Sequence, residues 1–343
     1  MKLSLPVGIC CFAAIIFGCL AAATADPKDP NKPEDPDKPE PKDPKKSKKI
    51  GFKIVGGFFR ASRLMVREYD AASRRLRVGQ PLPEPLFDRL FYAVGRGGGG
   101  ALLFVGGHTV VPVPLLLTES NNKLEEALGA NASDFRTHYR LMRHTEDYVT
   151  GASVGDDQYY VCGFKSVYQY GECFAYTFSE KRWQATPYAT FAREGWVLAA
   201  VGQRLYLTGG RGKGRKPSRR VDAFDTVQRT WSRAPDLPIA LFEHGAVGIK
   251  TSGGGDALLV CGGLSGRIRR QKRCYQLDFD LESQGWKAAP PLLEARIYTQ
   301  LLNCDGRVFA LGGNTIEELG PSGWRKVVSH VGPSVYRIPA VCN

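Results

Sequence analysis

The stretch LTGGRGKGRKPSRRVDAFDTVQRTW, from Leu207 to Trp231, contains the pattern that decides the fold. An apolar segment ends in two glycines, a basic loop follows, and an alternating segment then leads to a tryptophan. Alternation of apolar and polar residues is typical of a half-buried β-strand, and glycine tolerates the positive φ with which a chain turns sharply out of a strand. The stretch therefore predicts two β-strands joined by a basic loop.

The same pattern recurs along the chain. An apolar segment followed by two glycines occurs at residues 56–57, 106–107, 209–210, 262–263 and 312–313, and Gly163-Phe164 is a sixth, variant copy. In four units an aromatic or apolar residue precedes a tryptophan or leucine by seven positions: Tyr69–Leu76, Leu117–Leu124, Tyr176–Trp183 and Phe224–Trp231. Six units with a period near 50 residues indicate a repeat protein, in which each unit packs against its neighbours.

This repeat resembles the kelch repeat over residues 50–343. The resemblance is carried by the glycine pairs, the Tyr-Asp-like segments Tyr69-Asp70 and Phe224-Asp225, and the spaced tryptophans. It implies an all-β fold, a six-bladed kelch β-propeller with one four-stranded sheet per blade. The terminal segment VYRIPAVCN is similar to ARIYTQLLNC, which begins at Ala295. We therefore expect the last residues to complete blade one as its innermost strand.

Two further regions precede the repeats. Residues 1–25 predict a cleaved signal peptide, because an apolar run is followed by small residues at the spacing that signal peptidase requires. An uncleaved signal anchor is the alternative, since the run is long enough to span a bilayer. Residues 26–49 predict an extended linker rich in Pro, Lys and Asp, with proline at every third position from Pro27 to Pro39. We expect a secreted or secretory-pathway protein, with the sequon at Asn131 exposed for glycosylation.

Six cysteines follow the predicted signal peptide in three pairs. Cys162 and Cys261 precede the glycine signature, and Cys173 and Cys274 open the next strand of the same unit. Antiparallel neighbours meet the distance requirement, so Cys162–Cys173 and Cys261–Cys274 are possible disulfides. The alternative is that small buried residues simply fit these places, as Thr208 and Val221 do in unit four. A Cys304–Cys342 disulfide is disfavoured because it requires adjacent blades to approach closely.

The net charge of +13 favours anionic partners. Two adjacent units carry cations in the loop between their second and third strands: Arg211, Lys213, Arg215, Lys216, Arg219, Arg220, Arg267, Arg269, Arg270, Lys272 and Arg273. A second set occupies the turns that lead into the innermost strands: Arg89, Arg193, His244, Arg296 and Arg337. In the related kelch-like adaptor family, these two loop sets form the partner-binding face. The resemblance thus implies a site for an acidic protein segment or an anionic glycan; a solvated basic surface is the alternative.

The sequence contains no pattern that predicts a catalytic, cofactor or metal site. There is no HxxxH or CxxC, and Arg215-Lys216 follows the glycines where a P-loop needs Lys-Ser/Thr. We therefore expect a monomeric, non-enzymatic binding module with no nucleic-acid partner and no membrane span after signal cleavage. The alternatives are a secreted sugar-processing enzyme similar to kelch mutarotases, and the propeller of a truncated cytosolic ubiquitin-ligase adaptor. The adaptors place BTB and BACK domains before their propeller, and neither is present here.

Overall fold

In a computed structural model, residues Lys48–Asn343 form one compact unit. The structure describes residues 50–55, 66–80, 93–105, 115–119, 123–127, 149–164, 171–189, 193–212, 215–266, 269–279, 285–331 and 340–343. The predicted signal peptide, the predicted linker and Asn131 lie outside the described residues.

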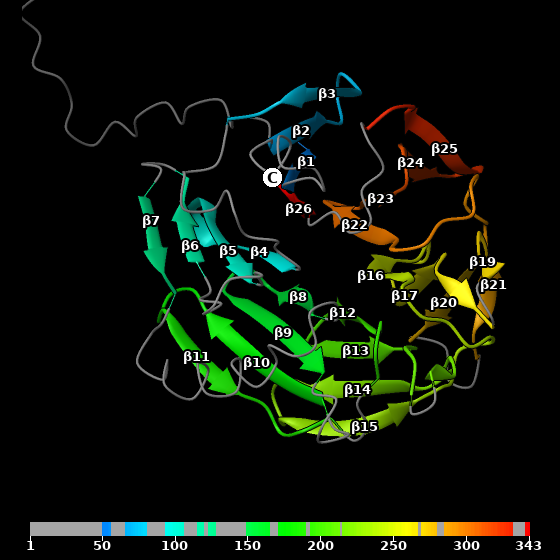
Figure 1. The fold of residues 1–343 in the computed structure, drawn as a ribbon, viewed down its shortest axis with the longest axis horizontal. Coiled ribbons are helices and arrows are strands. Elements are labelled where there is room, and N and C mark those ends of the chain that lie inside the picture. Colours follow the sequence, from blue (N-terminus) through cyan, green and yellow to red (C-terminus); the bar gives the residue numbers. More distant parts are fainter. Residues whose placement is uncertain are drawn as a thin grey trace, which may run out of the picture. The chain divides into compact units, whose positions relative to one another are not determined.

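The described strands form six four-stranded antiparallel sheets, arranged in a ring (Figure 1). From the innermost strand outward, the first three blades are β26 (Ala340–Cys342), β1 (Gly51–Val55), β2 (Val66–Asp70) and β3 (Arg75–Val78); β4 (Ala93–Gly97), β5 (Ala101–Val105), β6 (Leu115–Thr118) and β7 (Lys123–Glu126); and β8 (Thr150–Val154), β9 (Gln158–Phe164), β10 (Gly171–Thr177) and β11 (Arg182–Ala185). The other three are β12 (Val197–Val201), β13 (Arg204–Thr208), β14 (Val221–Asp225) and β15 (Thr230–Ala234); β16 (Gly245–Lys250), β17 (Asp256–Cys261), β20 (Cys274–Asp278) and β21 (Lys287–Ala289); and β22 (Gln300–Cys304), β23 (Arg307–Gly312), β24 (Thr315–Gly320) and β25 (Gly323–Val328). This confirms the predicted six-bladed propeller.

The seven-residue spacing seen in the sequence corresponds to a directly opposed pair of residues in the outer hairpins of blades one to four. Tyr69–Leu76, Leu117–Leu124, Tyr176–Trp183 and Phe224–Trp231 lie directly opposite one another in the sheet register. The ring centroids of Phe224 and Trp231 are 5.0 Å apart, and Phe224 is fully buried. Directly opposed residues are the closest side-chain neighbours in an antiparallel sheet, so the spacing fixes the register of the hairpin.

Four tryptophans also connect blades three to six to the blade that precedes each of them. Their indole Nε1–H groups donate to a backbone oxygen just after the outer strand of the preceding blade: Trp183 to Ala127, Trp231 to Pro187, Trp286 to Pro235 and Trp324 to Pro290, at 2.6–2.9 Å. An indole has a single donor, which finds a partner when the ring packs at an interface. One repeated hydrogen bond therefore links blades two to three, three to four, four to five and five to six.

The glycine pair has the conformation that the repeat predicts. Gly209 and Gly210 have φ values of 58° and 93°. A Cβ atom on Gly209 would lie 2.4 Å from the carbonyl oxygen of Leu241, in the turn that leads into the next blade. Both the backbone conformation and the close approach therefore require glycine at residue 209.

The carboxyl-terminal strand closes the ring, as predicted. Strand β26 pairs with β1 through Phe52–Cys342, Lys53–Val341 and Ile54–Ala340. The backbone N–H of Asn343 donates to the oxygen of Gly51 at 3.0 Å. Blade one is therefore built from both ends of the repeat region.

All three cysteine pairs form disulfides. Cys162–Cys173 and Cys261–Cys274 join residues that lie opposite one another in neighbouring strands, with Cα atoms 4.0 and 4.1 Å apart. Cys304–Cys342 joins blades six and one, with a Cα separation of 5.4 Å. The expectation against this third disulfide was wrong, because the innermost strands of adjacent blades converge at the narrow centre of the ring.

Candidate partner-binding face

The basic loops of blades four and five lie on the same side of the ring as the turns that lead into the innermost strands. Isolated backbone bridges connect the two sets: Glu194–Arg211, Ser218–Leu241, Phe242–Leu264 and Gln271–Arg296. In blade five the loop also folds into a two-stranded ribbon, β18 (Leu264–Ser265) and β19 (Arg269–Arg270). The structure thus brings the two basic loops and the described turns at Glu194, Leu241 and Arg296 to one face, which we call the basic face.

Seven of the predicted cations on the basic face are exposed: Arg215, Lys216, Arg219, Arg269, Arg270, Lys272 and Arg273. Arg219 also donates from Nε to the backbone oxygen of Leu237 at 2.5 Å, which fixes the base of its side chain. Lys213, Arg267, Arg89 and Arg337 lie outside the described residues. The exposed set comes from two adjacent loops and places seven positive charges on this face.

Arg211 connects the two loops rather than extending freely into solvent. Its guanidinium forms an ion pair with Glu194 and lies 4.4 Å from the centroid of the Phe242 ring. Phe242 in turn exchanges two backbone hydrogen bonds with Leu264, at 3.1 and 2.8 Å, in the blade-five loop. These contacts hold the blade-four loop in a fixed position relative to the blade-five ribbon. Arg220 is also half-buried, and it pairs with Asp222 at 2.8 Å.

Arg193 and Arg296 do not belong to the binding surface, and this part of the prediction was wrong. Each side chain is 3% exposed. Arg193 donates to Asp222 at 2.9 Å and to the backbone oxygen of Gly209, and Arg296 donates to Glu317 and to the backbone oxygen of Gly312. Burial lowers the pKa of Arg193, and the Asp222 carboxylate opposes that shift. Both arginines hold the glycine turn of their own blade in place.

His244 is also buried, at 1% exposure, so its assignment to the binding surface was wrong. Its Nε2 lies 2.7 Å from the Thr208 hydroxyl. Burial, with a smaller effect from Arg193, lowers its pKa to about 3, so the ring is neutral at physiological pH. In the sheet register, the pair Gly245–Cys261 of blade five takes the place of the pair Val197–Thr208 of blade four. Arg193 lies four residues before Val197, so its counterpart in blade five is Leu241, four residues before Gly245, and not His244.

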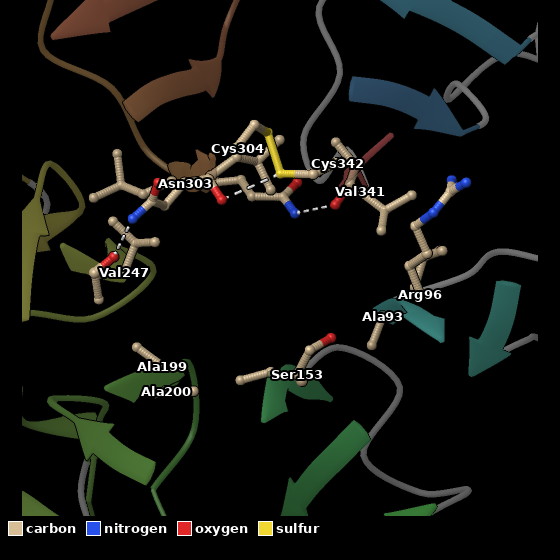
Figure 2. A pocket seen from close by; sticks show the side chains of 18 of the residues that line it. Ala93, Arg96, Ser153, Ala199, Ala200, Val247, Asn303, Cys304, Val341 and Cys342 are labelled. Atoms are coloured by element: carbon tan, nitrogen blue, oxygen red, sulfur yellow. Dashed lines mark hydrogen bonds between the residues drawn. A yellow bond between two sulfur atoms is a disulfide. The ribbon is translucent and has the colours of Figure 1, made fainter. Parts of the chain in front are cut away.

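A cavity of about 1070 Å³ occupies the centre of the ring. Figure 2 shows Arg96, Ser153, Asn303 and the Cys304–Cys342 disulfide at its wall. None of the seven exposed cations lines this cavity. The basic face is therefore an open surface, suited to a partner that lies across it rather than one that is enclosed.

The string GASVG at residues 151–155 matches GxSxG, but it lies in β8 and the turn into β9 rather than at the strand-to-helix turn on which that motif depends. Within the described ranges, no group of three or more His, Cys, Asp or Glu side chains could hold a metal ion. The same ranges contain no helix long and apolar enough to cross a membrane.

Comparison with known proteins finds kelch proteins. A family model described as the Kelch motif matches residues 195–238, which include the stretch around Gly209-Gly210. The chain is similar to human Kelch-like protein 25, with 28% identity over 130 residues that cover 36% of this chain and 21% of the relative. Human Kelch-like protein 34 is 31% identical over 134 residues, covering 38% and 20%, and Kelch-like protein 26 of Danio rerio is 26% identical over 167 residues, covering 47% and 26%. The chain thus matches about a fifth to a quarter of the length of these curated relatives.

Proposed function

We propose, from the premise that this chain is a kelch-repeat β-propeller, that it is a non-enzymatic binding module whose basic face holds an anionic partner. The observation that carries the proposal is the group of seven exposed cations on two loops that are tied together through Arg211, Phe242 and Leu264. The partner is an acidic protein segment or an anionic glycan. Because the surface is open, the partner has to be extended and to carry several charges.

A secretory location is part of the same proposal. Three disulfides join all six cysteines of residues 50–343. Disulfides persist in oxidising compartments and are rare in the cytosol. The cysteine chemistry thus supports secretion and weighs against the reading as a cytosolic ligase adaptor.

The test reverses three exposed charges of the blade-four loop in the variant R215E/K216E/R219E. Binding to immobilised heparin and to a poly-glutamate peptide is measured over a range of salt concentrations. We expect the variant to bind both ligands more weakly. The slope of log affinity against log salt concentration should also become shallower by about two to three, because three cationic contacts are lost and each contact releases about one counterion. The stronger of the two responses identifies the class of partner.

The matched control is R74E/R75E/R77E, in the exposed outer hairpin of blade one, which changes the net charge by the same amount. We expect this variant to retain most of the binding. If the two triple variants lose affinity equally, attraction depends on net charge alone and the basic face is not a site.

A further inference from the structure

The Cys304–Cys342 disulfide differs in position from the other two. Cys162–Cys173 and Cys261–Cys274 each lie within one blade, and these four cysteines are 0–2% exposed. Cys304–Cys342 instead joins β22, the innermost strand of blade six, to β26, the closing strand of blade one. Among the disulfides of the described residues, it alone crosses from one blade to another.

This disulfide faces the central cavity. Cys304 and Cys342 both line the space of about 1070 Å³, whereas the other four disulfide-bonded cysteines do not. Figure 2 shows the sulfur–sulfur bond at the wall of the open space, across from Ser153 and Ala199. Cys342 is half-buried and Cys304 is 4% exposed. A small molecule in the cavity therefore approaches Cys342 more readily than Cys304.

The closing strand is short, although its residues Ala340 and Val341 are buried, at 3% and 8% exposure. Strand β26 has three residues paired with β1, whereas β1 pairs with β2 over five. Towards blade six, the Gln300 side-chain amide donates to the backbone oxygen of Ala340 at 3.0 Å. The Cys304–Cys342 disulfide adds a covalent connection between this short strand and β22 of blade six. Its reduction leaves β26 held by side-chain packing and hydrogen bonds alone.

We infer that Cys304–Cys342 is a redox-modification site for low-molecular-weight thiols that enter the central cavity, and that its reduction releases β26 and opens the ring. A thiolate attacks Sγ of Cys342, forms a mixed disulfide there and expels the Cys304 thiolate. A second thiolate attacks the mixed disulfide, which releases the oxidised thiol dimer and the Cys342 thiolate. Two thiols are oxidised, one disulfide gains two electrons, and the protons of the thiols end on the two cysteines.

The test uses the purified full chain, treated with increasing glutathione under native conditions. Free cysteines are alkylated and identified by mass spectrometry. We expect Cys304 and Cys342 to be alkylated before any other disulfide-bonded cysteine. Amide hydrogen exchange, measured on the same samples, should accelerate in β26 and β1 by on the order of 10- to 1000-fold, the factor that corresponds to loss of a typical disulfide constraint.

Two variants separate this site from a general effect of reduction. C304S/C342S should show the fast exchange of β26 without glutathione, whereas the matched variant C162S/C173S should respond to glutathione at β26 as the unmodified chain does. The inference is wrong if all six cysteines react together, if Cys304–Cys342 resists glutathione until the chain unfolds, or if β26 keeps its protection after this disulfide is reduced. The measurement on the unmodified chain decides the question even if a serine variant does not fold.

Discussion

Arg193 and Asp222 show how a buried charge is accommodated in this propeller. Blade six repeats the pair as Arg296 and Glu317, at equivalent places in the register. In blade five, Leu241 and Tyr275 occupy the two places, so neither charge is present. Both partners change together because removal of one alone leaves an uncompensated charge away from water.

Substitution of Asp222 by Ala should therefore be costly. Arg193 remains buried without its partner, and we expect the free energy of unfolding in urea to fall by about 3–5 kcal/mol. The double variant R193L/D222Y copies the blade-five arrangement and should be more stable than D222A. The explanation would be contradicted if the free energy of unfolding of the double variant fell by as much as the falls in R193L and D222Y added together.

His244 makes stability depend on pH. Its pKa is about 3 in the folded protein against an ordinary value of 6.5, so the unfolded chain binds a proton that the folded one excludes. Its contribution is complete above pH 6.5 and is lost as the pH falls towards 3. We expect the free energy of unfolding to fall by about 1 kcal/mol per pH unit between pH 6 and 4.5.

The variant H244Q isolates this effect, because glutamine can donate to Thr208 but does not titrate. The carboxylates with lowered pKa, such as Asp225 and Glu318, lose their contribution at lower pH, below their ordinary values of 3.8 and 4.5. Urea unfolding of H244Q should therefore be nearly flat over the window in which the unmodified chain changes. Equal slopes for both proteins would show that His244 is not the group responsible.

At the scale of the elements, the tryptophans of the outer hairpins supply hydrogen bonds between blades. The Trp231 indole donates to Pro187 of the preceding blade at 2.8 Å while its ring packs on Phe224. The variant W231F keeps most of the ring and loses the donor. We expect a loss of about 1 kcal/mol in urea unfolding, the usual net value of one hydrogen bond. The same cost is expected for W286F, which loses the bond to Pro235; no change in either variant would contradict the proposed link.

At the scale of the whole molecule, closure depends on a strand from the far end of the chain. Deletion of residues 336–343 removes β26 and leaves the inner edge of β1 unpaired. We expect the single cooperative thermal transition to be replaced by a broad one, because a ring of blades is stable only when each blade has two neighbours. An unchanged melting curve after the deletion would show that closure does not require β26.

The sequence by itself determined the blades, their number and the closing strand. The glycine pairs and the seven-residue spacing involve residues that are close in the sequence. Residues of one hairpin lie opposite each other at a fixed separation along the chain, so their pairing can be predicted from the sequence. The two basic loops were also predictable, since charge is read directly from composition.

Only the tertiary structure decided which side chains of the candidate site reach solvent. Arg193, Arg296 and His244 are buried, and His244 lies three positions after Leu241, which is the true counterpart of Arg193 in the register. Burial depends on groups distant in the sequence, such as Thr208 for His244 and Glu317 for Arg296. The Cys304–Cys342 disulfide was missed for the same reason, because it forms only where closure of the ring brings the strands of different blades together.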